Sequence, residues 1–136
     1  MGACGGFSIN FRNPKAVAAL RKHLESYLDV RPIYTGDYYP LTPHNLDKEA
    51  WIAWQFHRAD LNEGVVQAFR RPEATDETLT VKLRGLAPQQ RYVIENLDGG
   101  KEVHAGAELM QGLDITLREK PAAAVLVLKA IQSIIP

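Results

Sequence analysis

The chain has 136 residues, a length that suits one domain with a single core. Hydrophobic residues make up 46% and charged residues 24% of the sequence, a composition typical of folded domains and unlike that of disordered segments. Sixteen basic and sixteen acidic residues cancel, so the net charge does not attract nucleic acid or an anionic membrane surface. We therefore expect neither nucleic acid nor a membrane as a partner.

The first residues are rich in glycine and contain the single cysteine, Cys4. One thiol cannot form an internal disulfide, and the histidines are too scattered to indicate a metal site. Cys4 as a nucleophile would need His44, His57 or His104 folded against it as a base, so a glycine turn beside a small thiol is the favoured interpretation. The segment lacks a secretory signal pattern, and we expect a cytoplasmic location unless a longer parent chain carries an export signal.

Asn13 and Pro14 predict the start of a helix, because Asn caps free amides and Pro lacks an N–H that would be unpaired there. Apolar residues then recur at three- and four-residue spacing on one face: Val17, Leu20, Leu24 and Leu28. Pro32 disfavours helical geometry in the residue before it, so the helix should end by Val30 or Arg31. One amphipathic helix alone cannot bury such a stripe.

Residues 33–45 contain three tyrosines and two of the prolines, and we expect an ordered loop there. After it the hydrophobic period changes from 3.6 to 2, which indicates strands. The predicted strands are 51–57, 64–70, 79–83, 91–96, 101–104, 113–118 and 122–130. The pattern predicts a mainly β fold, an antiparallel β-sandwich of six to eight strands preceded by one amphipathic helix.

Catalytic motifs such as GxGxxG, GxSxG and HExxH do not occur, so carboxylates are the remaining candidates for chemistry. Asp37 is the only carboxylate in an aromatic setting, which could raise its pKa or let it hold a sugar hydroxyl. Hydrogen bonding of Asp37 to its own loop amides is the favoured interpretation. We assign no catalytic residue, no metal ligand and no cofactor.

Flat aromatic side chains offer a second kind of site, because they stack on sugars as well as on other protein surfaces. The candidate sugar or interface contacts, taken together with Asp37, are Tyr38, Tyr39, Trp51 and Trp54. Trp51 and Trp54 fall on opposite faces of one predicted strand, so at least one of them should lie in the core. For each single aromatic, packing is favoured over sugar binding.

Several runs carry a resemblance to a known family: YTGDYYPLTP at 34–43, AWIAWQFHR at 50–58, GVVQAFRR at 64–71, LRGL at 83–86, ENLD at 95–98 and GAELM at 106–110. Over residues 30 to 131 the chain resembles the C-terminal region of melibiase-type α-galactosidases of glycoside hydrolase family thirty-six. The resemblance implies an antiparallel β-sandwich at 33–136. It also implies that residues 1–32, with the helix, resemble the end of a (β/α)8 barrel.

The family's two catalytic aspartates lie on barrel segments upstream of the matching region, so the resemblance gives no residue here a catalytic role. It implies a non-catalytic domain that stabilises a glycosidase barrel or an oligomer, with a parent that hydrolyses α-galactosides with retention. The implied partners are the barrel of a longer chain or a second copy of this one. Two alternatives stay open: a free-standing carbohydrate-binding module that binds galactosides, and a small enzyme that depends on Asp37.

Overall fold

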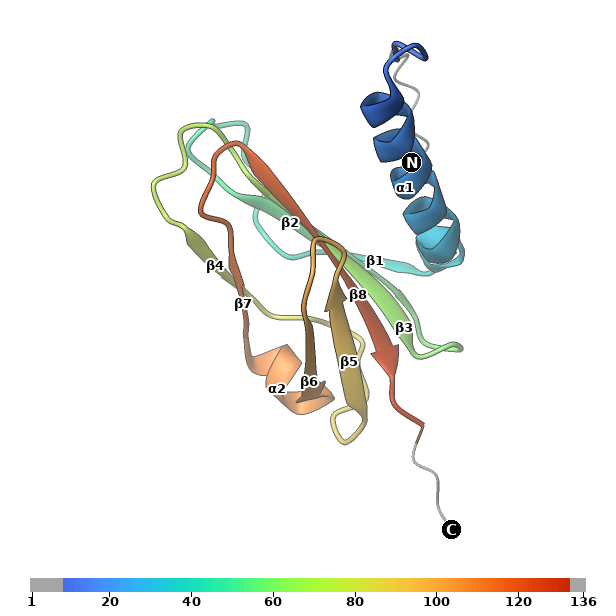
Figure 1. Ribbon diagram of the computed structural model, residues 1–136. Helices are drawn as coiled ribbons and strands as arrows, with labels where there is room; N and C mark the ends of the chain where they lie inside the picture. The colour runs from blue at the N-terminus through green and yellow to red at the C-terminus, as the bar shows by residue number, and fades with distance from the viewer. Residues whose placement is uncertain (1–8, 133–136) are drawn as a thin grey trace.

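The computed structural model describes residues 9–132 of the chain, and Cys4 with the predicted glycine turn lies outside them. Within that range the structure contains two α-helices, one 3-10 helix and eight strands (Figure 1). In chain order these are α1 (Pro14–Val30), η1 (Arg31–Thr35), β1 (Asp37–Pro40), β2 (Ile52–Arg58), β3 (Glu63–Arg70), β4 (Thr78–Val81), β5 (Arg91–Asn96), β6 (Lys101–Ala105), α2 (Gly106–Gln111), β7 (Leu113–Thr116) and β8 (Ala122–Ala130).

Six strands form one antiparallel sheet in the order β1-β2-β3-β8-β5-β6, and β4 pairs with β7 in a second sheet. In the centre of the large sheet, Val65 lies opposite Val127 and Val66 opposite Leu126. Because successive residues of a strand face opposite sides, these two pairs occupy different faces. We call the face with Val65 the outer face and the face with Val66 the inner face. The predicted mainly β, antiparallel architecture is confirmed.

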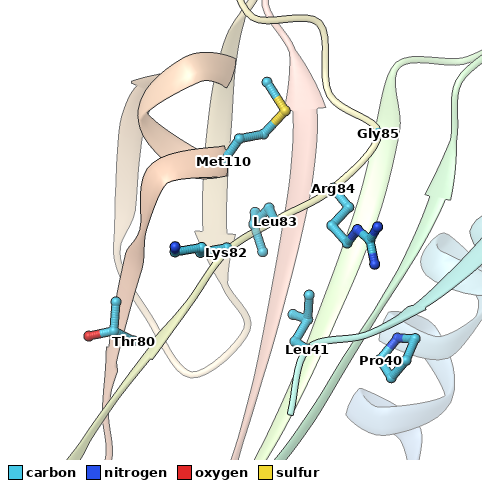
Figure 2. A pocket seen from close by; sticks show the side chains of 8 residues that line it. All are labelled: Pro40, Leu41, Thr80, Lys82, Leu83, Arg84, Gly85 and Met110. Carbon is cyan, nitrogen blue, oxygen red and sulfur yellow. The ribbon is translucent and has the colours of Figure 1, made fainter. Parts of the chain in front are cut away.

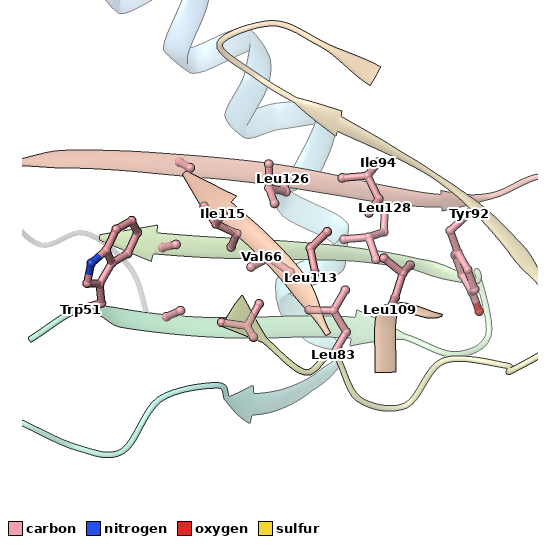
Figure 3. Close-up of a cluster of buried hydrophobic side chains, with 14 of the residues drawn as sticks. Trp51, Val66, Leu83, Tyr92, Ile94, Leu109, Leu113, Ile115, Leu126 and Leu128 are labelled. Atoms are coloured by element: carbon pink, nitrogen blue, oxygen red, sulfur yellow. The ribbon is translucent and has the colours of Figure 1, made fainter. Parts of the chain in front are cut away.

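The main core lies between the inner face and the layer formed by the small sheet and α2 (Figure 3). Leu128 and Tyr92 contribute from the large sheet, while Leu83 and Leu109 contribute from the opposite layer, and all four are buried. The Tyr92 hydroxyl accepts a hydrogen bond of 3.1 Å from the amide of Ala87, so its polar atom is satisfied inside the core. The inward-facing side chains of the period-2 pattern thus pack the large sheet against the layer of the small sheet and α2.

Arg70, at the end of β3, is a buried cation that ties two loops to the sandwich. Its guanidinium donates five hydrogen bonds of 2.7–3.3 Å to the carbonyl oxygens of Ala74, Thr75, Leu117 and Arg118. These bonds use every N–H that an arginine side chain offers. Arg70 therefore acts as a structural cross-link between the segments that follow β3 and β7.

The helix α1 begins and ends where the sequence predicts. The Asn13 side chain accepts hydrogen bonds from the amides of Lys15 and Ala16, at 3.0 and 3.4 Å, and Pro14 is the first helical residue. The helix ends at Val30, two residues before Pro32. Figure 1 shows α1 on one side of the β structure and the small sheet on the other.

The prediction of a loop over residues 33–45 is wrong for its first half. The chain continues from α1 into η1, in which Pro32 is compatible with the helical start, and then forms β1 at the edge of the large sheet. Pro40 fits the end of this strand because an edge strand tolerates a residue without an N–H. Four residues containing two adjacent tyrosines are too short to show a period of two.

The short helix α2 was not predicted, because six residues cannot display a period of 3.6. The Glu108 carboxylate accepts a hydrogen bond of 2.9 Å from the Ala105 amide at the helix start. At Gly106, an added Cβ would lie 2.0 Å from the carbonyl oxygen of Ala87, so only glycine allows this close approach. The turn before β5 and the start of α2 are therefore pressed together.

Candidate functional site

The five candidate contact residues do not form one site, because strand alternation divides them between the two faces of the large sheet. Register places Tyr38 opposite Phe56 on the outer face, where Trp54 also lies. Asp37 and Tyr39 point to the inner side with their partners on β2, and Trp51 belongs to the main core. An active site or a sugar platform that uses all five residues together is therefore not present.

Trp51 is 8% exposed and its indole N–H donates a hydrogen bond of 3.0 Å to the carbonyl oxygen of Asp76. The ring packs in the core at the start of β2 (Figure 3). A tryptophan enclosed in this way satisfies its polar atom and leaves little open face for a ligand. Its observed role is to close one end of the sandwich.

Trp54 takes part in a chain of polar contacts on the outer face. Its indole N–H donates to the side-chain oxygen of Gln67 at 2.6 Å, and the Gln67 amide donates to the Tyr34 hydroxyl at 3.0 Å. The Trp54 ring lies 5.1 Å from that of Phe69, tilted by 36°. Burial raises the pKa of the Tyr34 hydroxyl above its ordinary value. These contacts connect η1 with the two strands beneath it.

Tyr38 is 55% exposed and its ring centroid lies 5.3 Å from that of Phe56, with an angle of 54° between the planes. Tyr39 lies on the other side, with the Arg84 guanidinium 5.5 Å from its ring centroid. Gly85 follows with a positive φ of 72°, and an added Cβ would lie 2.9 Å from the Tyr39 hydroxyl. Tyr39 is thus enclosed by the segment after β4, while Tyr38 faces outward.

Asp37 and His57 lie opposite each other on β1 and β2, a pairing that sequence reasoning did not identify. His57 is 2% exposed, and its Nδ1 atom has no hydrogen-bond partner among residues 9–132. Burial lowers the pKa of the His57 imidazole, and the negative charge of Asp37 opposes part of that shift. Little in the sequence indicates this burial, because His57 alternates with the mixed set Trp51, Ala53 and Gln55 on its predicted strand.

A shallow groove of about 670 Å³ lies between β1 and the segment that follows β4 (Figure 2). Leu41, Leu83 and Met110 provide apolar lining, and Lys82 and Arg84 provide the charged groups. None of the described residues that line it is an aspartate, glutamate or histidine. The groove therefore lacks the pair of carboxylates on which most glycoside hydrolysis depends.

Residues 9–132 contain no group of three or more His, Cys, Asp or Glu side chains arranged to hold a metal ion. No helix in the same range has the length and apolar character required to cross a membrane.

The most unusual surface belongs to α1. Leu24, Tyr27 and Leu28, which the helical period places on one stripe, are 50%, 49% and 59% exposed, and Val30 is the buried residue of the helix. Exposed apolar stripes on a helix are typical of surfaces that pack against another element or chain. Fold and surface together define the class of protein. It is a small antiparallel β-sandwich preceded by a helix whose apolar stripe is exposed.

A model of the Glycosyl hydrolase family 36 C-terminal domain matches residues 51–129, more than half of the chain. The chain therefore belongs to this family of C-terminal domains. No curated protein matches the chain.

Solved structures show the same fold. The GH36 alpha-galactosidases AgaB and AgaA from Geobacillus stearothermophilus are each 29% identical to the chain, with TM-scores of 0.72 and 0.73. The galactosidase domain of AgaSK, an alpha-galactosidase-sucrose kinase, is 24% identical with a TM-score of 0.71, a likeness of fold alone. Each match covers 88% of this chain but only 16% of the other. The chain thus spans about a sixth of the length of these proteins.

Proposed function

We propose that the chain is the non-catalytic C-terminal domain of a larger family 36 glycoside hydrolase, and that it stabilises the catalytic barrel or an oligomer of it. In this proposal residues 33–136 form the sandwich domain, and residues 1–32 carry the last helix of the barrel. The parent would hydrolyse α-galactosides, the activity that AgaA and AgaB carry in their names. Retention of configuration in that reaction is what the family resemblance implies.

The observation that carries the proposal is the exposed stripe of α1, formed by Leu24, Tyr27 and Leu28. These residues have the spacing of a buried helix face, yet they are 49–59% exposed to solvent. Burying the exposed part of three such side chains contributes on the order of 3 kcal/mol. A barrel that packs against α1 would supply that burial, and so would a second copy of the chain.

The distribution of carboxylates supports a non-catalytic role. Asp37 lies at the exposed edge of the large sheet, and the carboxylate-free groove lies between β1 and the segment after β4. The chemistry of a glycosidase requires two carboxylates that face each other across a sugar ring. In the proposal these groups belong to the barrel, and the domain contributes stability rather than reacting atoms.

A carbohydrate-binding module is the second candidate, because Tyr38 and Trp54 share the outer face and Tyr38 is more than half exposed. The ring of Tyr38 is tilted against Phe56, and the Trp54 indole is tilted against Phe69 and hydrogen-bonded to Gln67. Rings locked at these angles do not form the flat row that stacks along a sugar chain. The outer face therefore fits packing against protein better than binding of galactosides.

Two assays on the 136-residue chain separate these candidates. Incubation with a chromogenic α-galactoside should release no product above the buffer rate, and titration calorimetry with raffinose should give no saturable heat. Hydrolysis that disappears in Asp37→Asn would establish a small enzyme instead. Saturable heat that is lost in Tyr38→Ala would establish the binding module instead. This variant does not change Tyr92, which is buried in the core.

A further inference from the structure

The 3-10 helix η1, which connects α1 to the sheet, is bound by the side chain of an arginine at the end of β2. The Arg58 guanidinium donates to the carbonyl oxygen of Pro32 at 3.0 Å and to the Thr35 hydroxyl at 2.9 Å. Its other N–H groups bind the Asp60 carboxylate at 2.8 and 2.6 Å, and these bonds lower the pKa of that carboxyl. One side chain therefore connects η1 with the β2–β3 turn.

A second connection starts from Tyr34 and reaches the centre of the sheet. The Gln67 side chain donates to the Tyr34 hydroxyl at 3.0 Å and accepts from the Trp54 indole at 2.6 Å. The Tyr34 ring also meets that of Phe56 edge to face, with centroids 5.0 Å apart. Tyr34 is thus held by two neighbouring strands, through contacts independent of Arg58.

Apolar packing and one glycine also attach η1 to the large sheet. Ile33 is buried, and with Val30 it packs against Val65 and Val127 on the outer face. At Gly36 an added Cβ would lie 2.2 Å from a backbone oxygen of β2, so the turn into β1 rests directly on that strand. We call this set of contacts around η1 the joint.

The Tyr27 ring of α1 lies near the joint, with its centroid 6.4 Å from that of Tyr34. Leu24 and Leu28 remain exposed, so the described part of the chain does not hold the helix along its length. We infer that the joint fixes the direction of α1, so that the chain presents the helix as a rigid arm already oriented for its partner, with Arg58 as the positioning residue. The identity of that partner, the catalytic barrel of a longer chain, rests on the proposed function. Fixing the orientation in advance lowers the entropy cost of docking.

Distance measurement between two spin labels tests the inference on the 136-residue chain. Labels at Arg21→Cys on the exposed side of α1 and Lys101→Cys on β6, in a Cys4→Ser background, report the direction of the helix. The unaltered joint should give one narrow distance distribution. Arg58→Met should broaden the distribution about twofold, because a loosened joint samples more angles. Arg31→Met, at an exposed arginine of the same segment, should leave it narrow.

Thr35→Val is the milder variant, because it removes one acceptor of Arg58 and leaves the guanidinium bound to Asp60. It should broaden the distribution less than Arg58→Met does, and it replaces that variant if circular dichroism shows Arg58→Met to be unfolded. A broad distribution in the unaltered joint overturns the inference, as does a distribution that neither variant changes. A narrow distance distribution in a protein whose native form has no barrel would contradict the proposed function but not this inference. A broad distribution in a protein whose native form is a full glycosidase would contradict this inference but not the proposed function.

Discussion

Leucine side chains are buried in the β-sandwich and exposed on the arm, the helix α1. Leu128, on β8, is completely buried, whereas Leu28, on α1, is 59% exposed although its spacing predicts a buried face. The sandwich buries its own apolar side chains between two layers, whereas within residues 9–132 no second layer covers the apolar stripe of α1. The contrast distinguishes the sandwich, which stabilises the domain, from α1, which in our proposal contacts a partner. The predictions below test this separation, in order of decreasing effect on the free energy of unfolding.

The largest effect is expected from truncating a core leucine. Leu128→Ala removes buried contacts and leaves a cavity, which should lower the free energy of unfolding by about 2–5 kcal/mol. Leu28→Ala on the arm is the matched control and should change it by less than about 0.5 kcal/mol. Urea denaturation followed by tryptophan fluorescence measures both values. Equal losses would show that α1 is packed as firmly as the core.

A smaller loss should follow when the buried cross-link is removed. Arg70→Ala leaves the carbonyls of two loops without their donors, and we expect a loss of about 2–3 kcal/mol. The neighbouring Arg71, whose side chain donates to the carbonyl oxygen of Asp47 at the surface, serves as the control. Arg71→Ala should cost less than about 1 kcal/mol in the same denaturation experiment. A reversed order would mean that the guanidinium of Arg70 does not hold the sandwich together.

The third prediction concerns acid stability and His57. Because burial lowers the pKa of this imidazole in the folded state, the unfolded chain binds the proton more readily. Stability should therefore be fully present above the unfolded pKa of about 6.5 and decrease as the pH falls toward the lowered folded value. Thermal unfolding at a series of pH values measures this slope.

His57→Gln should flatten the dependence in that interval, whereas the same change at the exposed His44 should leave it as it is. Asp37→Asn should make the dependence steeper, because the carboxylate opposite His57 favours the protonated form. An unchanged slope in His57→Gln would assign the acid sensitivity to other groups.

The smallest effect in the isolated chain is expected on the arm itself. Leu24→Gln combined with Leu28→Gln should change the free energy of unfolding by less than about 0.5 kcal/mol, because both side chains are already half exposed. In a longer polypeptide that contains the barrel, the same pair should cost about 2 kcal/mol or more, because there they would be buried. Differential scanning calorimetry of both forms provides the comparison, and similar small changes in both would refute docking through α1.

The fold was largely predictable, because the sequence signals are local. Asn13 and Pro14 mark the start of α1, and period-2 alternation locates the strands that carry the core. The elements that escaped prediction, η1, β1 and α2, have five, four and six residues. Elements this short do not display a period, and their positions are determined by contacts with distant segments.

The candidate site was less predictable for the same physical reason. Tyr38 and Tyr39 are adjacent in sequence, so a strand separates them onto opposite faces, and recognition of β1 was needed to see this. Arg58 and Arg70 looked like ordinary polar positions, because their partners lie at distant carbonyl groups that no local pattern reveals. The exposure of the α1 stripe also depends on what the rest of the chain leaves uncovered.

The central claim is that this sandwich serves a larger glycosidase. The most direct test is the mass of the native polypeptide, captured from its source cells with an antibody against the sandwich and measured by mass spectrometry. We predict a species several times heavier than the 15.2 kDa of this chain, with α-galactosidase activity in the captured material. A species of 15.2 kDa without such activity would contradict the account and show that the domain acts alone.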